Sequence, residues 1–360
     1  MSVPTYRSDL DAIPQYRPGR PIEEVTRELG IESLDKLASN ECPEKPFPEV
    51  IDAIAAAASG VNRYPDNDTY DLTRAIAVHQ GVDPGNIWVG SGSSEVLRCA
   101  ALAVGGPETS AVFPSPSFVM YRISTMVAGA TPIAIPLTDA FEHDLDAMME
   151  AIRDDTTIAY LCNPNNPTGG HIAGVDVARF IDEVPLRVLV VVDEAYAEYV
   201  TADDYRSFVD EALVRPNVLV TRTFSKIYGL AGLRVGYGIG SVDLISSLRR
   251  TQAPFSVTSA SQSAALEALR HQNRVAERRN SNADERAALV GNLRDLGFSP
   301  APTQANFVYF EPGTPAAEVG EGLLHRGEIV RVLGDGIRVT VGTPEENHRF
   351  IAALREVVTS

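Results

Sequence analysis

The chain has 360 residues, of which 44% are hydrophobic, and it carries a formal net charge of −17 at pH 7. This length predicts roughly two domains, and the composition suffices for a large buried core. The acidic excess argues against nucleic acid or an anionic membrane as the main partner, and it favours small-molecule ligands.

The cysteines and the N-terminal residues point to one compartment. The three cysteines, at positions 42, 99 and 162, lack the spacing of metal ligands and fit reduced thiols. Arg7 and Asp9 stand where a secretion signal would be apolar, and no apolar run approaches membrane-spanning length. We therefore expect a cytoplasmic protein without a metal site.

Strand-like and helical patterns alternate from Asn86 to about Asp243, which predicts parallel βαβ units with right-handed crossovers. Beyond about residue 256 the pattern changes to helices at 260–270 and 282–296, short strands around Phe307, Val330 and Val339, and a helix from Pro344 to about Val358. We expect an α/β protein with two domains. Residues 46–255 form a large domain with a mostly parallel sheet, and residues 1–45 and 256–360 form a smaller α+β domain.

In chain order, the first segment that suggests chemistry is 162–169, Cys-Asn-Pro-Asn-Asn-Pro-Thr-Gly, which follows an apolar strand at 158–161. Two prolines and a glycine stiffen this loop, so an asparagine amide can be held against a ligand oxygen without ordering cost. We assign that role to Asn166. A proline-rich turn without any ligand is the alternative.

The second segment is the β-branched run 189–192, followed by Asp193 and, three residues later, Tyr196. Such runs are typical of central parallel strands, and ligands bind at the carboxyl ends of these strands. Asp193 is thus a candidate partner for a protonated ring nitrogen, and Tyr196 a candidate hydrogen-bond donor to a phenolic oxygen. The alternative for Asp193 is a helix N-cap.

The third segment, 221–234, places Lys226 among hydroxyls, glycines and a downstream arginine. A lysine that condenses with an aldehyde must lose its proton near neutral pH, which requires a partly desolvated, cation-rich pocket. Thr223 and Ser225 offer hydroxyl donors, and Arg234 offers a planar fork for a phosphate. Together these groups predict a pyridoxal-phosphate site, against the alternative of a surface lysine and arginine on a glycine-rich loop.

With these three segments and four others, 37–41, 62–66, 90–95 and 337–342, the chain resembles the fold-type I pyridoxal-phosphate aminotransferases over nearly its whole length. The resemblance is to the branch that contains histidinol-phosphate and aromatic amino acid aminotransferases. It implies the aspartate aminotransferase-like fold of pyridoxal-phosphate-dependent transferases.

The resemblance assigns further cofactor contacts. Ser93 and Ser94 open a helix expected at 94–104, whose first backbone N–H groups would bind the phosphate. Phe118 would stack on the pyridine ring, although an isolated phenylalanine is more often a core residue. Tyr64 would reach the phosphate of a neighbouring subunit, which implies a homodimer with a shared active site.

The resemblance also assigns substrate contacts. Arg338 would pair with a substrate carboxylate, with a structural ion pair as the alternative, and Arg331 would lie beside it. Tyr16 would close over the substrate side chain, and Asn40 would also bind substrate. Lys226 would move a proton between the substrate α-carbon and the cofactor, first with an amino acid and then with a keto acid in ping-pong order.

The choice of substrate rests on smaller differences. A short connection between Arg331 and Arg338 resembles actinobacterial aromatic aminotransferases, whereas Ser115-Pro116-Ser117-Phe118 is closer to the histidinol-phosphate enzymes. We expect transfer between an aromatic amino acid and 2-oxoglutarate, with histidinol phosphate as the alternative. An effector-sensing module on the same fold, or a decarboxylase or racemase, are further alternatives.

Overall fold

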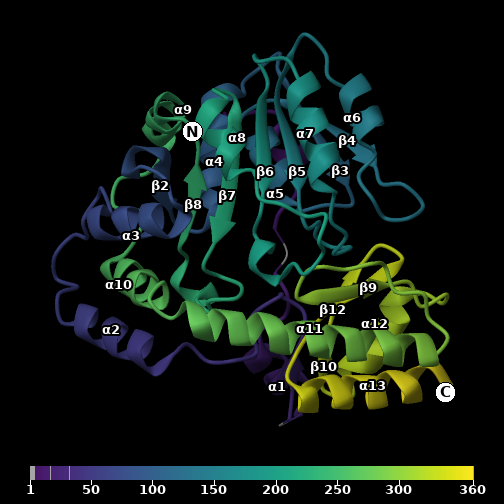
Figure 1. Cartoon of the computed structure of the whole chain (residues 1–360). Helices are drawn as coiled ribbons and strands as arrows, with labels where there is room; N and C mark the ends of the chain where they lie inside the picture. Colours follow the sequence, from purple (N-terminus) through teal and green to yellow (C-terminus); the bar gives the residue numbers. More distant parts are fainter. Residues whose placement is uncertain (1–4, 17, 32, 360) are drawn as a thin grey trace.

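The computed structural model describes residues 5–16, 18–31 and 33–359, and it is built around a sheet of seven strands (Figure 1). In spatial order the strands are β2 (Ile87–Gly90), β8 (Gly236–Ile239), β7 (Val218–Thr223), β6 (Leu189–Asp193), β5 (Thr156–Cys162), β3 (Ser110–Ser115) and β4 (Thr131–Pro136). In this sheet β8 runs antiparallel to both its neighbours, and the other described pairs are parallel.

Helices cover both faces of this sheet, so that all five residues of β6 are buried. Val190 and Val192 share one apolar cluster with residues of α2 (Pro48–Ala58), α3 (Tyr70–Gln80), α6 (Leu145–Glu150), α7 (Gly174–Glu183), α8 (Val209–Val214) and α10 (Ser259–Ala268). Leu189 and Val191 belong to a second cluster with α4 (Ser93–Val104), α5 (Met120–Val127) and α9 (Val242–Leu248). The predicted α/β pattern is therefore present.

A second, antiparallel sheet has the order β11 (Arg331–Leu333), β12 (Gly336–Thr340) and β9 (Phe307–Phe310). Its apolar face packs in a separate cluster with α11 (Gln272–Asp295), α12 (Ala316–Leu324) and α13 (Pro344–Thr359). Val330, where a strand was expected, separates β10 (Glu328–Ile329) from β11. The remaining elements are α1 (Ile22–Leu29), β1 (Asp35–Lys36), and the 3-10 helices η1 (Leu10–Ala12), η2 (Pro84–Asn86), η3 (Ala197–Tyr199), η4 (Ala231–Leu233) and η5 (Arg249–Thr251).

Helix α11 begins ten residues before the start expected at 282, and Figure 1 shows it running beneath the large sheet toward α13. Its Val275 packs with the large sheet, whereas Leu289 and Leu293 pack with the small one. Because the helix is polar in its first half and packs against two different cores, it has no single apolar stripe from which its full length could be predicted. The domain boundary at 255/256 stays a prediction.

The segment 35–40 crosses from the N-terminal part of the chain to the small sheet. Strand β1 pairs in parallel with β10, and the Leu37 carbonyl accepts from the Thr340 N–H at 2.8 Å. Asn306 donates from Nδ2 to the Asn40 carbonyl at 3.1 Å. These bonds place Ser39 and Asn40 opposite the carboxyl ends of β5, β6 and β7.

Two further observations concern the described residues. None of their helices has both the length and the apolar composition needed to span a bilayer. Among the same residues, no three His, Cys, Asp or Glu side chains gather as a metal site would require.

Candidate active site

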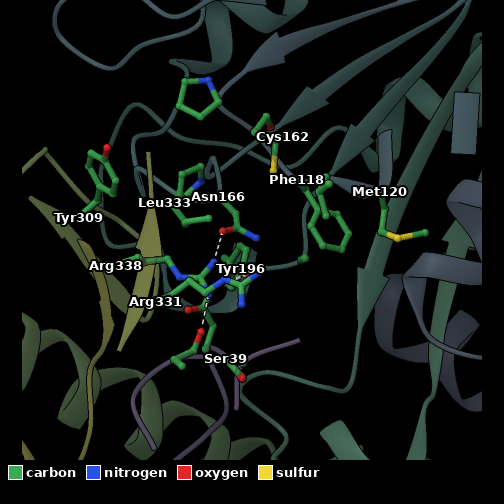
Figure 2. A pocket seen from close by; sticks show the side chains of 18 of the residues that line it. Ser39, Phe118, Met120, Cys162, Asn166, Tyr196, Tyr309, Arg331, Leu333 and Arg338 are labelled. Carbon is green, nitrogen blue, oxygen red and sulfur yellow. Dashed lines mark hydrogen bonds between the residues drawn. The ribbon is translucent and has the colours of Figure 1, made fainter. Parts of the chain in front are cut away.

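A cavity of about 1010 Å³ lies between the carboxyl edge of the large sheet and the small sheet (Figure 2). Among its lining residues are all the predicted site residues except Tyr64: Tyr16, Asn40, Ser93, Ser94, Phe118, Asn166, Asp193, Tyr196, Thr223, Ser225, Lys226, Arg234, Arg331 and Arg338. They come from strand ends, loops and a helix start far apart in the sequence, and the fold brings them together.

Lys226 follows β7 and is half-buried. Its Nζ donates to the Ser39 carbonyl at 3.4 Å and lies 5.5 Å from the centroid of the Tyr196 ring. Burial lowers the pKa of Lys226 to about 7, and the nearby positive charge of Arg338 acts in the same direction. A considerable fraction of this amine is therefore neutral, and able to attack a carbonyl, at physiological pH.

Arg234 and the start of α4 form a cradle for an anion. Arg234 adopts a left-handed backbone conformation, with φ of 53°, and its NH1 donates to Ser225 Oγ at 3.3 Å. Gly92 has a φ of 75°, which disfavours any residue with a Cβ, and a Cβ there would also stand 2.6 Å from Arg234 NH2. Helix α4 begins at Ser93, one residue earlier than expected, and its first N–H groups face the same end of the cavity.

Glu95 holds this cradle in place, a role not predicted from the sequence. Its Oε2 accepts from the Ser91 N–H at 2.6 Å, from Ser256 Oγ at 2.8 Å and from Gln252 Nε2 at 3.2 Å. Near Arg234, the Thr223 hydroxyl oxygen accepts from the Ser225 N–H at 3.1 Å. The backbone around the anion cradle is thus hydrogen-bonded before any ligand arrives.

Asp193 is 2% exposed, and both of its carboxylate oxygens accept hydrogen bonds. Tyr121 OH donates to Oδ2 at 2.8 Å, and Thr221 Oγ1 donates to Oδ1 at 2.9 Å. Burial raises the pKa of Asp193, and these two donors oppose that rise because they stabilise the charged form. Thr221 could have been found from the sequence, since parallel register places it opposite Asp193; Tyr121, stacked on Tyr160, had no such signal.

The opposite wall joins the two sheets through Tyr196, Asn40, Asn166 and Arg338. Asn40 Nδ2 donates to Tyr196 OH at 2.9 Å. Arg338, 8% exposed, donates from NH1 to Asn166 Oδ1 and from NH2 to the Ala38 carbonyl, the second at 2.6 Å; Figure 2 labels Arg338 beside Asn166. Burial lowers the pKa of Arg338 to about 10, which still leaves the group charged at neutral pH.

Arg331 lies next to Arg338, since the two are direct partners across the β11–β12 pair. Tyr16 is 56% exposed at the rim of the cavity, and Phe118 is half-buried with its ring edge-on to Tyr121 at 5.8 Å. Two adjacent guanidinium groups make this side of the cavity suitable for anionic substrates.

Tyr64 lies outside the cavity and is 81% exposed. Its ring stacks on Phe255 with centroids 4.6 Å apart. The predicted contact of Tyr64 with a neighbouring subunit is not visible in a single chain and stays a prediction.

Comparison with known proteins agrees with this geometry. The model of the family described as "Aminotransferase class I and II" matches residues 33–354. A histidinol-phosphate aminotransferase from Moorella thermoacetica is 41% identical, over 99% of this chain and 94% of its own length. An aromatic amino acid aminotransferase from Corynebacterium glutamicum is also 41% identical, over 98% of each chain.

A solved structure is similar over the whole fold. The histidinol-phosphate aminotransferase from Sinorhizobium meliloti, in complex with pyridoxal-5'-phosphate, has a TM-score of 0.91 at 28% identity and covers 99% of this chain and 98% of that chain. Since relatives with two different substrates are equally similar in sequence, similarity alone does not choose between these substrates.

Proposed function

Because the chain belongs to the class I and II aminotransferases, we propose that it transfers an amino group between an aromatic amino acid and 2-oxoglutarate with pyridoxal 5'-phosphate as cofactor. The family and the fold predicted from the sequence are confirmed, and with them a pyridoxal-phosphate-dependent aminotransferase.

The residues present fit this cofactor. Arg234, Ser225 and the first N–H groups of α4 would hold its phosphate, with Thr223 supporting their loop. Asp193 would pair with the pyridine nitrogen, and Phe118 would stack on the ring. Asn166 and Tyr196 would bind the phenolic oxygen.

Lys226 and Arg338 have separate roles in the proposed reaction. When bound, the cofactor supplies an aldehyde and an electron-withdrawing ring, which stabilises the charge left at the substrate α-carbon. Lys226 moves the proton from that carbon, and Arg338 holds the substrate carboxylate. The observation that carries this proposal is a buried arginine, bonded to Asn166 and Ala38, in the same cavity as a lysine with a pKa of about 7.

The proposal that the substrate has an aromatic side chain rests on the end of the cavity away from the cofactor site. Phe141, Tyr309 and Leu333 line it with apolar surface, and the carboxylates of Glu311 and Asp335 lie there as well. These carboxylates repel a phosphate dianion but not a neutral ring. The observation that favours histidinol phosphate instead is the pair of adjacent guanidinium groups, Arg331 and Arg338.

The deciding experiment measures kcat/KM for phenylalanine, tyrosine and tryptophan with 2-oxoglutarate, and for histidinol phosphate with 2-oxoglutarate. We expect the aromatic amino acids to be preferred. A preference for histidinol phosphate by more than roughly 100-fold, about 2.7 kcal/mol, would assign the enzyme to that substrate instead.

The pH dependence of cofactor capture tests the environment of Lys226. Its pKa is lowered, so the neutral amine fraction should rise roughly tenfold between pH 6 and pH 8 and then level off. For a lysine with an ordinary pKa, the neutral fraction would instead continue to rise well above pH 8. The measurement is the rate at which cofactor-free protein reacts with pyridoxal 5'-phosphate, followed by absorbance; a rate that still climbs at pH 9 would contradict the assignment.

We further propose a cytoplasmic homodimer with a shared active site, in which Tyr64 completes the partner's phosphate site. Tyr64→Phe should then weaken cofactor binding by roughly 1 kcal/mol, the typical net contribution of one hydrogen bond. Equilibrium titration of the cofactor-free variant, with Tyr6→Phe as the control at another exposed tyrosine, measures the effect. A monomer that is fully active at assay dilution would rule the proposal out.

A further inference from the structure

The end of the cavity beyond Arg338 has a wall of two aromatic rings. Tyr309 on β9 is the direct cross-strand partner of Arg338 on β12, so both side chains emerge on the cavity face of the small sheet. The ring of Phe141, from the loop before α6, meets the Tyr309 ring edge-on, with centroids 5.5 Å apart at 71°. Figure 2 shows Tyr309 next to Arg338 and on the side away from Met120 and Phe118.

The position of Tyr309 depends on the absence of a side chain at Gly336. A Cβ at Gly336 would overlap the Tyr309 ring and hydroxyl, so the tyrosine lies directly over the backbone of β12. Tyr309 is 4% exposed. The Tyr309 ring is therefore held in a fixed position beside Arg338.

Phe141 is held from its own loop. It has a φ of 63°, a left-handed conformation that costs free energy for a residue with a Cβ and persists where the surroundings enforce it. The Phe141 N–H donates to the Thr138 carbonyl at 2.9 Å, the Thr138 N–H donates to the Glu142 carbonyl at 2.9 Å, and Leu137 pairs with His143. The loop thus presents Phe141 to the cavity in a strained but fastened conformation.

The charges around this wall are negative. Glu311 and Asp335 line the same end of the cavity, and both are exposed at its rim. Burial, followed by these two carboxylates, raises the pKa of Tyr309 to about 12, so its hydroxyl stays neutral. A carboxylate or phosphate placed here would be repelled, whereas an uncharged or hydrogen-donating ring would not.

We propose that Phe141 and Tyr309 form the subsite that binds the ring of the amino-acid substrate and sets its specificity. The inference rests on the proposed function, since Arg338 must hold the substrate carboxylate for the ring to reach this wall. The second substrate, a dicarboxylate, has no ring and therefore does not depend on this subsite. The two substrates would share Arg338 and differ in their use of Phe141 and Tyr309.

The test measures equilibrium binding of two unreactive acids to the holoenzyme, 3-phenylpropionate as the ring-bearing ligand and glutarate as the dicarboxylate. Phe141→Ala and Tyr309→Ala should each lower the affinity for 3-phenylpropionate on the order of 10- to 100-fold, because one hydrophobic contact with its ring is lost. The affinity for glutarate should change less than about threefold. Tyr309→Phe keeps the ring and should bind both acids as the wild type does. Val175→Ala, an exposed position on α7, is the control.

The outcomes separate this inference from the proposed function. Equal losses for both acids would mean that the two residues only maintain the shape of the site, and no loss for either would mean that the ring lies elsewhere; both overturn the inference. Failure of the wild type to bind 3-phenylpropionate also overturns it. Failure of the proposed function is seen separately, as a wild-type preference for histidinol phosphate in the kinetic comparison.

Discussion

The variant Lys226→Ala is expected to bind pyridoxal 5'-phosphate and yet to turn over at least ~10³-fold more slowly than the wild type, the loss that follows deletion of a nucleophile or general base. The phosphate cradle at Arg234 and α4 does not depend on the lysine, so affinity should persist in part. Without an amine near the α-carbon, the proton transfer loses its general base. Steady-state kinetics and absorbance spectra of the purified variant measure the two effects.

The composition of the chain makes the covalent assignment easy to check. The sequence contains three lysines, Lys36, Lys45 and Lys226, and only Lys226 lines the cavity. Borohydride treatment of the wild-type holoenzyme should remove its absorbance in the visible region and leave the cofactor mass on the peptide of Lys226. Lys45→Ala should behave as the wild type. Label on Lys36 or Lys45 would remove the central assignment.

The second large effect is expected at Arg338. Arg338→Lys should cost roughly 2–4 kcal/mol in kcat/KM for both phenylalanine and 2-oxoglutarate, because an ammonium cannot replace a fork that binds a carboxylate at two points. Cofactor affinity should barely change, since Arg338 bonds Asn166 and Ala38 and lies away from the phosphate cradle. Kinetics with both substrates and a cofactor titration test the two statements together.

Three results at Arg338 have different meanings. An equal loss for both substrates supports a shared carboxylate anchor. A different result would be a wild-type preference for histidinol phosphate of well over ~10²-fold, together with a loss of kcat/KM in Arg338→Lys that is as large for this substrate as for 2-oxoglutarate. That result would identify Arg338 as the phosphate anchor of the alternative function. Unchanged kinetics with a lower melting temperature would make Arg338 a structural residue, and the substrate assignment would be wrong.

Part of this site was predictable because its motif residues follow segments that the sequence identifies as parallel strands. Parallel strands share an edge at their carboxyl ends, so Asn166, Asp193 and Lys226, each at or just after the end of such a strand, had to converge. The start of α4 was predicted one residue late, and Arg234, named from the same segment as Lys226, lines the same cavity.

The rest depended on packing between distant segments. Tyr121 reaches Asp193 from a helix face, and Phe141 meets Tyr309 from a loop whose left-handed residue has no marker in its sequence. The early start of α11 was hidden because half of its turns pack against one core and half against another. Such contacts are set by tertiary geometry and override local patterns.

The hydrogen bonds of segment 35–40 have a consequence for how the chain acquires its activity during synthesis. Leu37 and Asn40 leave the ribosome long before Asn306, Ile329 and Thr340, the residues that hydrogen-bond to their backbone. The seven strands of the large sheet are complete by residue 239. A nascent chain can therefore assemble this sheet early, while its lysine gains a closed pocket only after Thr340 has been made.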